Sequence, residues 1–312
     1  MDPPAERWPA YVERPCTLVP VEEIEILVAG RSVMVRVAGD EDGFPVVHCH
    51  GTPGSRLEVS FGDEIAHQQS IRIISFDRPG YGQSDPASSS LGLVAQDVES
   101  IVDALRVGQF ATLGWSGGGP FALAVAAAMS DRVTHVGVSG GLAPVQQMPG
   151  AREELSENDL RALAYLPDEP DRAAAQFLED NKVFLDTMMS ARNDPTAPWI
   201  DWQWGESDAD AITDQQVRDA LFVSFHEALR QSPAAIAWDN VAFIGPWGFD
   251  FADVASPVHL WYGDRDLMAP SSNGTWLAQH LPNAELVVFE GEGHLLPLRH
   301  WAEMLRAVTT IR

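Results

Sequence analysis

Two hydrophobic periods alternate along this chain of 312 residues, and their order constrains the fold more than any other feature. Several apolar runs are continuous, which is typical of strands buried on both faces of a parallel sheet, and segments with helical spacing lie between them. This order predicts an α/β fold with a doubly wound, mostly parallel eight-stranded sheet, whose first two strands form an antiparallel edge hairpin. The predicted strands are Ile24–Val28, Val33–Val37, Val46–Cys49, Ile71–Phe76, Phe110–Leu113, Val133–Val138, Val258–Tyr262 and Glu285–Phe289.

One long stretch interrupts the alternation. From about Leu142 to Ala255 no strand pattern is evident, whereas apolar residues at helical spacing recur, such as Val217, Leu221 and Phe225. A helical insertion of this length between two strands is better explained as a cap than as a loop. We therefore expect a core built from residues 1–141 and 256–312, and a helical cap or lid built from residues 142–255.

Charge and composition exclude several classes of protein. Lys and Arg number 20 against 45 Asp and Glu, a net charge of −25, which disfavours nucleic acid and anionic membranes as partners. No apolar run approaches the roughly 20 residues that span a bilayer, and the N-terminus does not resemble a signal peptide. Cys16 and Cys49 are too few for a disulfide framework and are interpreted as free thiols, so we expect a cytoplasmic protein. The sequence leaves its oligomeric state open.

A serine flanked by glycines lies between a predicted strand and a predicted helix. The segment Gly114-Trp115-Ser116-Gly117-Gly118 has the pattern G-x-S-x-G. On a sharp strand-to-helix turn the serine backbone is strained, its hydroxyl is lifted clear of the sheet, and side chains at 114 and 118 would collide with their surroundings. The following helix points its N-terminal N–H groups toward charge that develops beside Ser116. This context favours Ser116 as a nucleophile.

A nucleophilic serine needs a base and a carboxylate, and candidates for both follow later strands. Gly263-Asp264-Arg265-Asp266 follows one predicted strand, and Gly291-Glu292-Gly293-His294 follows the next. Because the carboxyl ends of parallel strands share one edge of a sheet, these residues can converge on Ser116. His294 is the candidate base. Asp264 and Asp266 compete for the role of its partner, and we favour Asp266, with Asp264 as a turn-capping residue.

A further glycine-rich turn at the same edge offers donors for an oxyanion. The segment His50-Gly51-Thr52-Pro53-Gly54-Ser55 follows the third predicted strand. We expect the backbone N–H of Thr52, opposite that of Gly117, to bind the oxyanion of a tetrahedral intermediate. The turn lacks the Gly-Lys-Ser/Thr ending of a phosphate-binding loop. His48 and His50 would share a strand face, but no cluster of acidic or histidine partners accompanies them, so we expect no metal.

The segment from Asp77 to Asp85 contains two glycines that resemble a dinucleotide fingerprint only superficially. Aspartate stands at position 85, where a third glycine belongs, and no helix opens there. We interpret the segment as a structured turn that buttresses the active-site edge, with Asp77 and Arg78 paired within it. No cofactor is expected.

These motifs together resemble the α/β-hydrolase superfamily. The stretches HGTPGS, DRPGYGQSD, GWSGGG, GDRD and GEGH carry the resemblance, which extends over residues 46–129 and 258–298. Epoxide hydrolases and haloalkane dehalogenases of this fold attack with aspartate, so a serine at position 116 disfavours both chemistries. The HG-x-PG turn is shared with prolyl aminopeptidase-like members. The resemblance implies a helical cap, a triad of Ser116, Asp266 and His294, and an oxyanion hole at Thr52 and Gly117.

We expect the residues that select the substrate to lie in the cap. Five of the ten tryptophans fall there, and they suit a hydrophobic or acyl-bearing pocket, although packing between cap helices is the simpler interpretation. The acidic stretch Glu206–Asp210 could bind a cationic amine but is interpreted as a solvated loop. The five tryptophans are Trp199, Trp202, Trp204, Trp238 and Trp247.

The expected function is that of a cofactor-independent serine hydrolase. It would cleave a carboxylic ester, thioester or lactone of a small hydrophobic acyl substrate through an acyl-enzyme intermediate. Amide or carbon–carbon bond cleavage by the same triad, in the manner of prolyl aminopeptidases or ring-fission product hydrolases, stays open. A ligand-binding protein on an old hydrolase scaffold is a third possibility, but a pure binder has no need of a nucleophile, a base and an oxyanion hole together.

Overall fold

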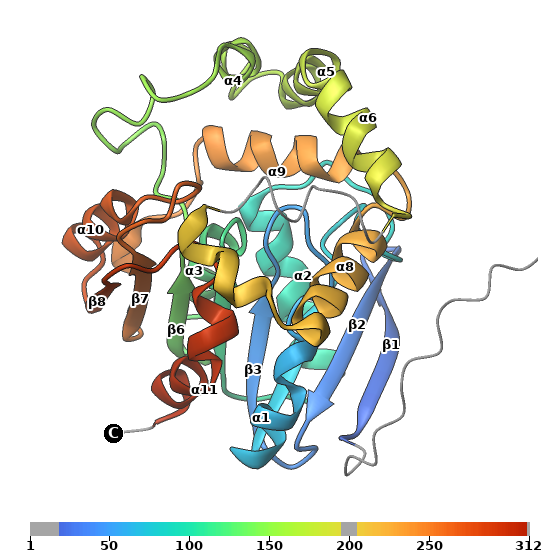
Figure 1. Ribbon diagram of the computed structural model, residues 1–312, viewed down its shortest axis with the longest axis vertical. Helices are drawn as coiled ribbons and strands as arrows, with labels where there is room; N and C mark the ends of the chain where they lie inside the picture. The colour runs from blue at the N-terminus through green and yellow to red at the C-terminus, as the bar shows by residue number, and fades with distance from the viewer. Residues whose placement is uncertain (1–18, 195–204, 311–312) are drawn as a thin grey trace, which may run out of the picture.

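The computed structural model describes residues 19–194 and 205–310, and an eight-stranded sheet forms its centre (Figure 1). The strand order is β1-β2-β4-β3-β5-β6-β7-β8; β2 pairs antiparallel with β1 and β4, and all other neighbours pair parallel. All eight predicted strands form, which confirms the predicted sheet and its edge hairpin. The strands are β1 (Val21–Val28), β2 (Arg31–Gly39), β3 (Phe44–Cys49), β4 (Ile71–Phe76), β5 (Phe110–Trp115), β6 (Val133–Ser139), β7 (Val258–Gly263) and β8 (Ala284–Phe289).

Helices cover both faces of this sheet. Successive strand residues point to opposite faces, so in β3 Val47 joins the apolar cluster on one face and Val46 the cluster on the other. Burial on both sides explains why the central strands are continuously apolar, and it confirms the doubly wound arrangement. One face carries α2 (Leu91–Ala104), α3 (Gly118–Ala128) and α10 (Ser271–His280), and the other carries α1 (Asp63–Gln68) and α11 (Leu296–Thr309).

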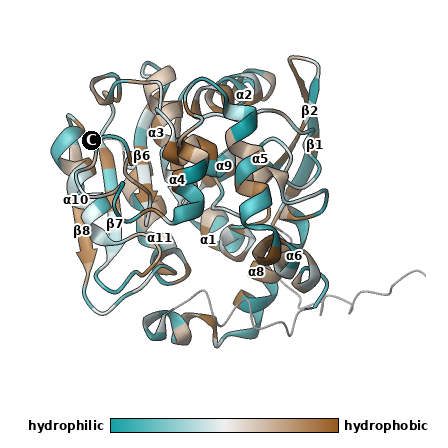
Figure 2. Cartoon of the chain, turned by 90° about the horizontal axis from the view of Figure 1, so that it is seen from above, coloured by the Kyte–Doolittle hydropathy of each residue, from teal (hydrophilic) through white to brown (hydrophobic). Residues whose placement is uncertain are grey.

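The segment 142–255, here called the cap segment, contains no strand in its described part. Helices α4, α5 and α9 lie across the top of the molecule, and α9 is mostly hydrophobic, whereas α4 and α5 carry both kinds of residue (Figures 1 and 2). The apolar cluster of the cap segment also contains Tyr81, Trp115 and Leu295, which lie outside the segment. The division of the chain into a core and a separate cap domain stays a prediction. The elements of the cap segment are α4 (Glu157–Leu163), α5 (Pro170–Asp180), α6 (Lys182–Ala191), η2 (Glu206–Ile212), α8 (Gln215–Ala228), α9 (Ala234–Ile244) and η3 (Phe251–Asp253).

The strand register brings distant chain segments to one edge of the sheet. Gly114 of β5 lies opposite Cys49 of β3, and Gly263 of β7 lies opposite Phe289 of β8. The loops after β3, β5, β7 and β8 therefore all leave from the carboxyl edge, where the binding sites of open α/β sheets form. Within the ranges that the structure describes, no helix is long and apolar enough to cross a membrane.

Candidate active site

Ser116 lies on a sharp turn between the end of β5 and the start of α3. Its φ of 55° is in the left-handed region, which costs a non-glycine residue free energy. A Cβ at position 114 would come within 2.3 Å of the Gly118 carbonyl oxygen, and a Cβ at position 118 within 2.0 Å of the Cys49 carbonyl oxygen. Both flanking positions therefore require glycine. The tight turn leaves Ser116 partly exposed among buried neighbours.

The loops after β7 and β8 bring a carboxylate to a histidine ring. Oδ2 of Asp266 lies 2.7 Å from Nδ1 of His294, and both residues are buried. The other oxygen, Oδ1, accepts hydrogen bonds from the backbone N–H groups of Met268 and Ala269, both at 2.8 Å, which fixes the carboxylate. Asp264 instead accepts a hydrogen bond from the Gly291 N–H at 2.7 Å. Of the two competing aspartates, the structure brings Asp266 to His294.

The segment 50–55, here called the oxyanion loop, lies against the Ser116 turn. A Cβ at position 51 would lie 3.4 Å from Cβ of Ser116, and a Cβ at position 117 would lie 2.6 Å from Oγ1 of Thr52. The structure thus brings Thr52 and Gly117 together beside Ser116. Over residues 19–194 and 205–310, neither of their backbone N–H groups donates to a protein acceptor. Both remain available to an oxygen of a substrate.

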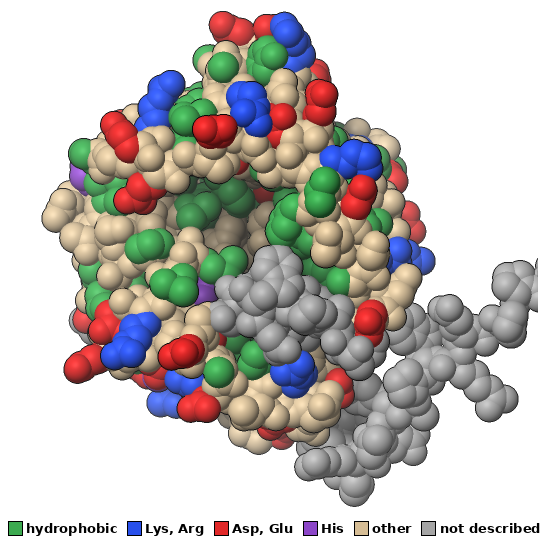
Figure 3. Space-filling view, turned by 45° about the horizontal axis from the view of Figure 1, so that its top comes forward, with side chains coloured by type: hydrophobic (Ala, Val, Ile, Leu, Met, Phe, Trp, Pro, Cys, Tyr) green, Lys and Arg blue, Asp and Glu red, His purple; other side chains and the backbone are tan. Residues whose placement is uncertain are grey.

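A pocket of about 60 Å³ opens where these parts meet. Ser116 and His294 both line it, and so does Thr52, while α8 of the cap segment adds Leu221, Ser224 and Phe225. Figure 3 shows a hollow on the face turned toward the viewer, with hydrophobic side chains gathered around it. The remaining lining residues are Gly51, Pro53, Glu58, Trp115 and Met268.

The fold and this geometry agree with a comparison against protein families. The model of the alpha/beta hydrolase fold family matches residues 45–300. The chain belongs to this family. The match spans the sheet from β3 to β8, the cap segment and the loops that hold Ser116, Asp266 and His294, so the resemblance noted in the sequence is confirmed.

Relatives of this α/β hydrolase differ in the reactions that their names describe. A 2-hydroxy-6-oxononadienedioate/2-hydroxy-6-oxononatrienedioate hydrolase of Cupriavidus pinatubonensis is 24% identical over 82% of both chains. A putative proline iminopeptidase of Mycoplasma pneumoniae is 25% identical over 85% of this chain and 89% of its own. Among solved structures, a thermophilic esterase from Thermogutta terrifontis superimposes with a TM-score of 0.65 at 19% identity, covering 93% of this chain and all of its own, which shows a shared fold.

The oxyanion loop of this α/β hydrolase is held by a buried polar network. The guanidinium of Arg78 donates to the carbonyl oxygens of His50 and Gly51 and to the Thr52 hydroxyl, and it pairs with Asp239 of α9 at 2.6 Å. Asp239 also accepts a hydrogen bond from the Tyr81 hydroxyl at 2.7 Å. Burial and the neighbouring carboxylate raise the pKa of Tyr81 well above its ordinary value, so its hydroxyl stays a donor.

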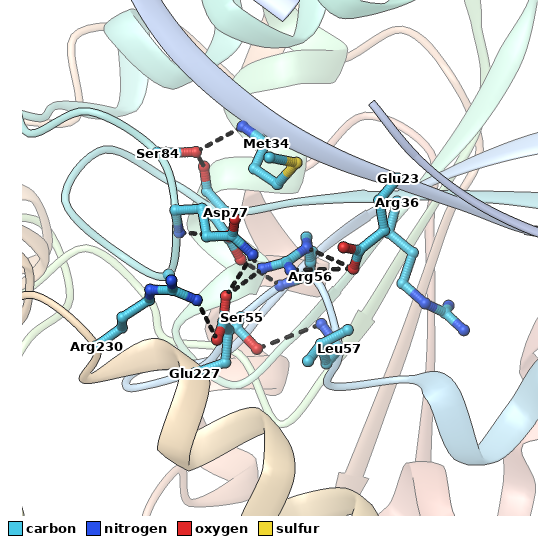
Figure 4. A network of polar contacts seen from close by, with 12 residues as sticks. Glu23, Met34, Arg36, Ser55, Arg56, Leu57, Asp77, Ser84, Glu227 and Arg230 are labelled. Carbon is cyan, nitrogen blue, oxygen red and sulfur yellow. Dashed lines mark hydrogen bonds and ion pairs between the residues drawn. The ribbon is translucent and has the colours of Figure 1, made fainter. Parts of the chain in front are cut away.

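The predicted pairing of Asp77 with Arg78 is wrong. Asp77 accepts hydrogen bonds from Arg56, at 2.7 Å from both the backbone nitrogen and the guanidinium, and Arg56 also pairs with Glu227 of α8 (Figure 4). Arg78 pairs with Asp239 instead. The Asp77 N–H still donates to the Met34 carbonyl oxygen of β2, so the chain stays extended past the end of β4, and consecutive side chains of an extended chain point to opposite sides. The two pairs nevertheless buttress the site, as the turn was expected to do.

Two buried carboxylates beside the site, Asp208 and Glu58, were not predicted from the sequence. The interpretation of Glu206–Asp210 as a solvated loop is wrong at Asp208, which is buried and accepts hydrogen bonds from the backbone N–H groups of His294 and Leu295, each at 2.9 Å. No pattern in the acidic run distinguishes Asp208 from its exposed neighbours. Glu58, another residue that sequence analysis did not single out, is buried in the pocket wall and accepts the Gly51 N–H at 2.9 Å.

The two histidines at the end of β3 are used in hydrogen bonds of the protein itself. Nε2 of His48 lies 2.9 Å from Glu58. The backbone N–H of Arg78 donates to Nε2 of His50, so Nδ1 of His50 carries the proton and donates to the Gly51 carbonyl oxygen. In the part of the chain that the structure describes, no group of three or more metal-ligating side chains occurs.

The two cap tryptophans that the structure describes do not line the pocket. Trp247 lies against Phe249 and Phe251, and Trp238 is part of the apolar cluster of the cap segment. Trp115, next to the serine, lines the pocket and also donates from its indole nitrogen to the His294 carbonyl oxygen at 3.1 Å. The other three tryptophans of interest, Trp199, Trp202 and Trp204, lie outside the described residues.

Proposed function

We propose that this protein is a serine hydrolase that cleaves a carboxylic ester, thioester or lactone through an acyl-enzyme intermediate. The observation that carries the proposal is the arrangement at the carboxyl edge of the sheet. Ser116, on its strained turn, lines one pocket with His294, whose Nδ1 lies 2.7 Å from Oδ2 of Asp266. A serine, a histidine and a carboxylate in this order form a hydrolytic triad.

Each residue has a defined role in the reaction. Oγ of Ser116 attacks the carbonyl carbon while Nε2 of His294 takes its proton, and Asp266 accepts the Nδ1 hydrogen bond and stabilises the imidazolium. The carbonyl oxygen becomes an oxyanion and accepts hydrogen bonds from the backbone N–H groups of Thr52 and Gly117. His294 then returns the proton to the leaving oxygen or sulfur. Water, activated by the same imidazole, attacks the acyl-enzyme and releases the acid.

The charges around the pocket support a neutral acyl group. Among the described residues that line it there is no Lys or Arg, and Arg78, which bonds to the oxyanion loop, is paired with Asp239. Residues 195–204, which lie outside the described ranges, contain no Lys or Arg either. A dienedioate, the substrate class named for several relatives, carries two carboxylates, and these would meet the carboxylate of Glu58 with no Lys or Arg in the described pocket wall to balance them. Carbon–carbon cleavage of such a compound is therefore the less favoured reaction.

A second candidate function is hydrolysis of an aminoacyl amide or ester. One observation favours it: Glu58 is the single carboxylate in the described pocket wall, and a substrate amine would complement its charge. A relative of similar length is named as a putative proline iminopeptidase. This reaction is second because both oxygens of Glu58 already accept the Gly51 N–H.

Mass spectrometry after incubation with a fluorophosphonate tests the proposal. We expect one adduct, located on Ser116, and none on the Ser116→Ala variant; a Ser100→Ala variant, altered on helix α2, should label like the unmodified protein. An unlabelled protein would instead support a binding role. A panel of p-nitrophenyl esters of increasing acyl length, aminoacyl naphthylamides and vinylogous diketones then separates the three reactions, with the esters expected to be turned over fastest. A small hydrophobic acyl substrate, independence of cofactors and a cytoplasmic location belong to the same proposal.

A further inference from the structure

We infer that Asp208, in the cap segment, is a positioning residue for His294. This inference rests on the proposed function and adds a part of the machinery to it. Oδ2 of Asp208 accepts the His294 N–H and Oδ1 accepts the Leu295 N–H, each at 2.9 Å, across 86 and 87 residues of sequence. Asp266 holds the imidazole ring, whereas Asp208 holds the main chain that carries it. Two carboxylates thus fix two different parts of one residue.

Both partners of the contact between Asp208 and the His294 loop have features that allow it. A Cβ at position 293 would come within 2.2 Å of Oδ2 of Asp208, so the carboxylate can approach only because residue 293 is glycine. Asp208 itself is only 4% exposed, although Glu206 and Asp210, two residues away on either side, are exposed. A buried carboxylate is stable only when its oxygens are hydrogen-bonded, and here both are.

The start of helix α11 explains why a carboxylate suits this place. Leu295 is the residue that precedes the helix, and the first N–H groups of a helix have no partner within it. A carboxylate that accepts from the N–H groups of Leu295 and of His294 before it makes charge-assisted hydrogen bonds and complements the positive end of the helix dipole. Without it, the backbone at His294 would lose two of the restraints that hold the ring toward Ser116. Misplacement of a reacting group by about 1 Å can cost about 100-fold in rate.

Because Asp208 belongs to the cap segment, the alignment of the base depends on how that segment is docked. Its element η2 contacts α8, and α8 supplies Leu221, Ser224 and Phe225 to the pocket. The part of the chain that would touch the acyl group is therefore connected to the part that holds the base. A cap segment that moves away from the sheet would take the support of His294 with it.

Two variants in the same element test this inference. Asp208→Asn and Asp210→Asn remove the same charge, but only the first removes an acceptor of the His294 loop. For Asp208→Asn we expect kcat/KM to fall by about 10- to 100-fold for an ester with an alkyl alcohol as leaving group, and by less for the p-nitrophenyl ester of the same acid. The reason is that a poor leaving group needs the proton that His294 returns, whereas p-nitrophenolate leaves without it. Asp210→Asn should match the unmodified protein on both esters.

A merely structural role of Asp208 gives a different result. A loss of folded protein lowers the turnover of both esters by the same factor, so an unchanged ratio between them overturns the inference, as does an Asp208→Asn variant with full activity. If Asp208→Asn does not fold, Asp208→Glu, which keeps the charge but misplaces it, is measured with the same pair of esters and should change the ratio. Fluorophosphonate labelling of the unmodified protein separates the two proposals: without labelling the proposed function fails, and with labelling but an unchanged ester ratio only the role of Asp208 fails.

Discussion

The hydroxyl of Thr52 donates a hydrogen bond to Oδ2 of Asp239, 2.5 Å away, and thereby joins the oxyanion loop to helix α9 of the cap segment. The same carboxylate pairs with Arg78 and accepts from Tyr81, and all these side chains except that of Thr52 are buried. The cap segment thus contacts the proposed machinery through Asp239 at the oxyanion loop and through Asp208 at the histidine. The same segment lines the pocket through α8 and bonds to polar groups beside it.

Replacing Asp239 should damage both stability and activity. Asp239→Asn keeps the size of the side chain but leaves the buried guanidinium of Arg78 without its counter-charge, so we expect a loss of about 3–5 kcal/mol in the free energy of unfolding. The oxyanion loop would also lose the anchor of Thr52, which should lower kcat. Urea unfolding and steady-state kinetics measure the two effects. Asp219→Asn, on the exposed side of α8, is the control and should stay within about 0.5 kcal/mol.

The glycines around the serine give a prediction that depends on geometry alone. In Gly118→Ala the new methyl group would lie 2.0 Å from the Cys49 carbonyl oxygen, and backbone must move to relieve the overlap. We expect a loss of about 3 kcal/mol or more in the free energy of unfolding, together with a loss of fluorophosphonate labelling. Gly92→Ala, in helix α2 with no atom within 4 Å of its new Cβ, should be neutral or stabilising by up to about 1 kcal/mol. Equal unfolding curves for the two variants would contradict this account.

The parts of the site that could be predicted are those set by local sequence. The turn at Ser116 follows from a strand, two obligatory glycines and a helix, all within a few residues. The meeting of Asp266 and His294 follows from parallel strands that end at one edge, so the order of strands along the chain was sufficient. Hydrophobic period and turn chemistry carry this information because they depend on neighbours in sequence.

The contacts that could not be predicted cross from one element to a distant one. Thr52 and Asp239 are separated by 187 residues, and Asp208 meets the histidine loop across 86. How cap helices dock on a sheet depends on the packing of whole surfaces, and a single aspartate in an acidic run shows no sign of the partner that buries it. The predicted pairing of Asp77 with Arg78 was wrong because the side chains of consecutive residues in an extended segment point to opposite sides.

The protonation of His50 predicts how stability varies with pH. Burial and the neighbouring Arg78 guanidinium lower the pKa of His50 well below its ordinary value of 6.5, so the folded protein holds a neutral ring. Below about pH 6.5 the unfolded chain binds a proton that the folded chain does not, so this contribution to stability is complete above that pH and is lost as the pH falls. The slope from this group approaches about 1.4 kcal/mol per pH unit.

Urea unfolding of the unmodified protein and of a His50→Asn variant between about pH 5 and pH 7 measures this slope. The variant is expected to be less stable at neutral pH, because it loses the ring that bridges Arg78 and Gly51, but its stability should fall less steeply as the solution is acidified. Parallel curves for the two proteins would mean that His50 is protonated in the folded state.

The two aspartates after β7 separate a role in orienting and stabilising the histidine from a structural one. Asp266 contacts Nδ1 of His294, whereas Asp264 only accepts the Gly291 N–H. An amide at position 266 can no longer accept a charge-assisted hydrogen bond from the ring, favours the wrong tautomer and leaves the imidazolium unsupported, so Asp266→Asn should lower kcat by about 10⁴-fold with the fold intact. Asp264→Asn retains an oxygen that can accept the same N–H and should keep kcat within a few-fold, at a cost of about 1 kcal/mol in stability. If Asp264→Asn were the inactive variant and Asp266→Asn the active one, the aspartate in the triad would be misassigned, and the ring of His294 would have to turn toward a different partner during the reaction.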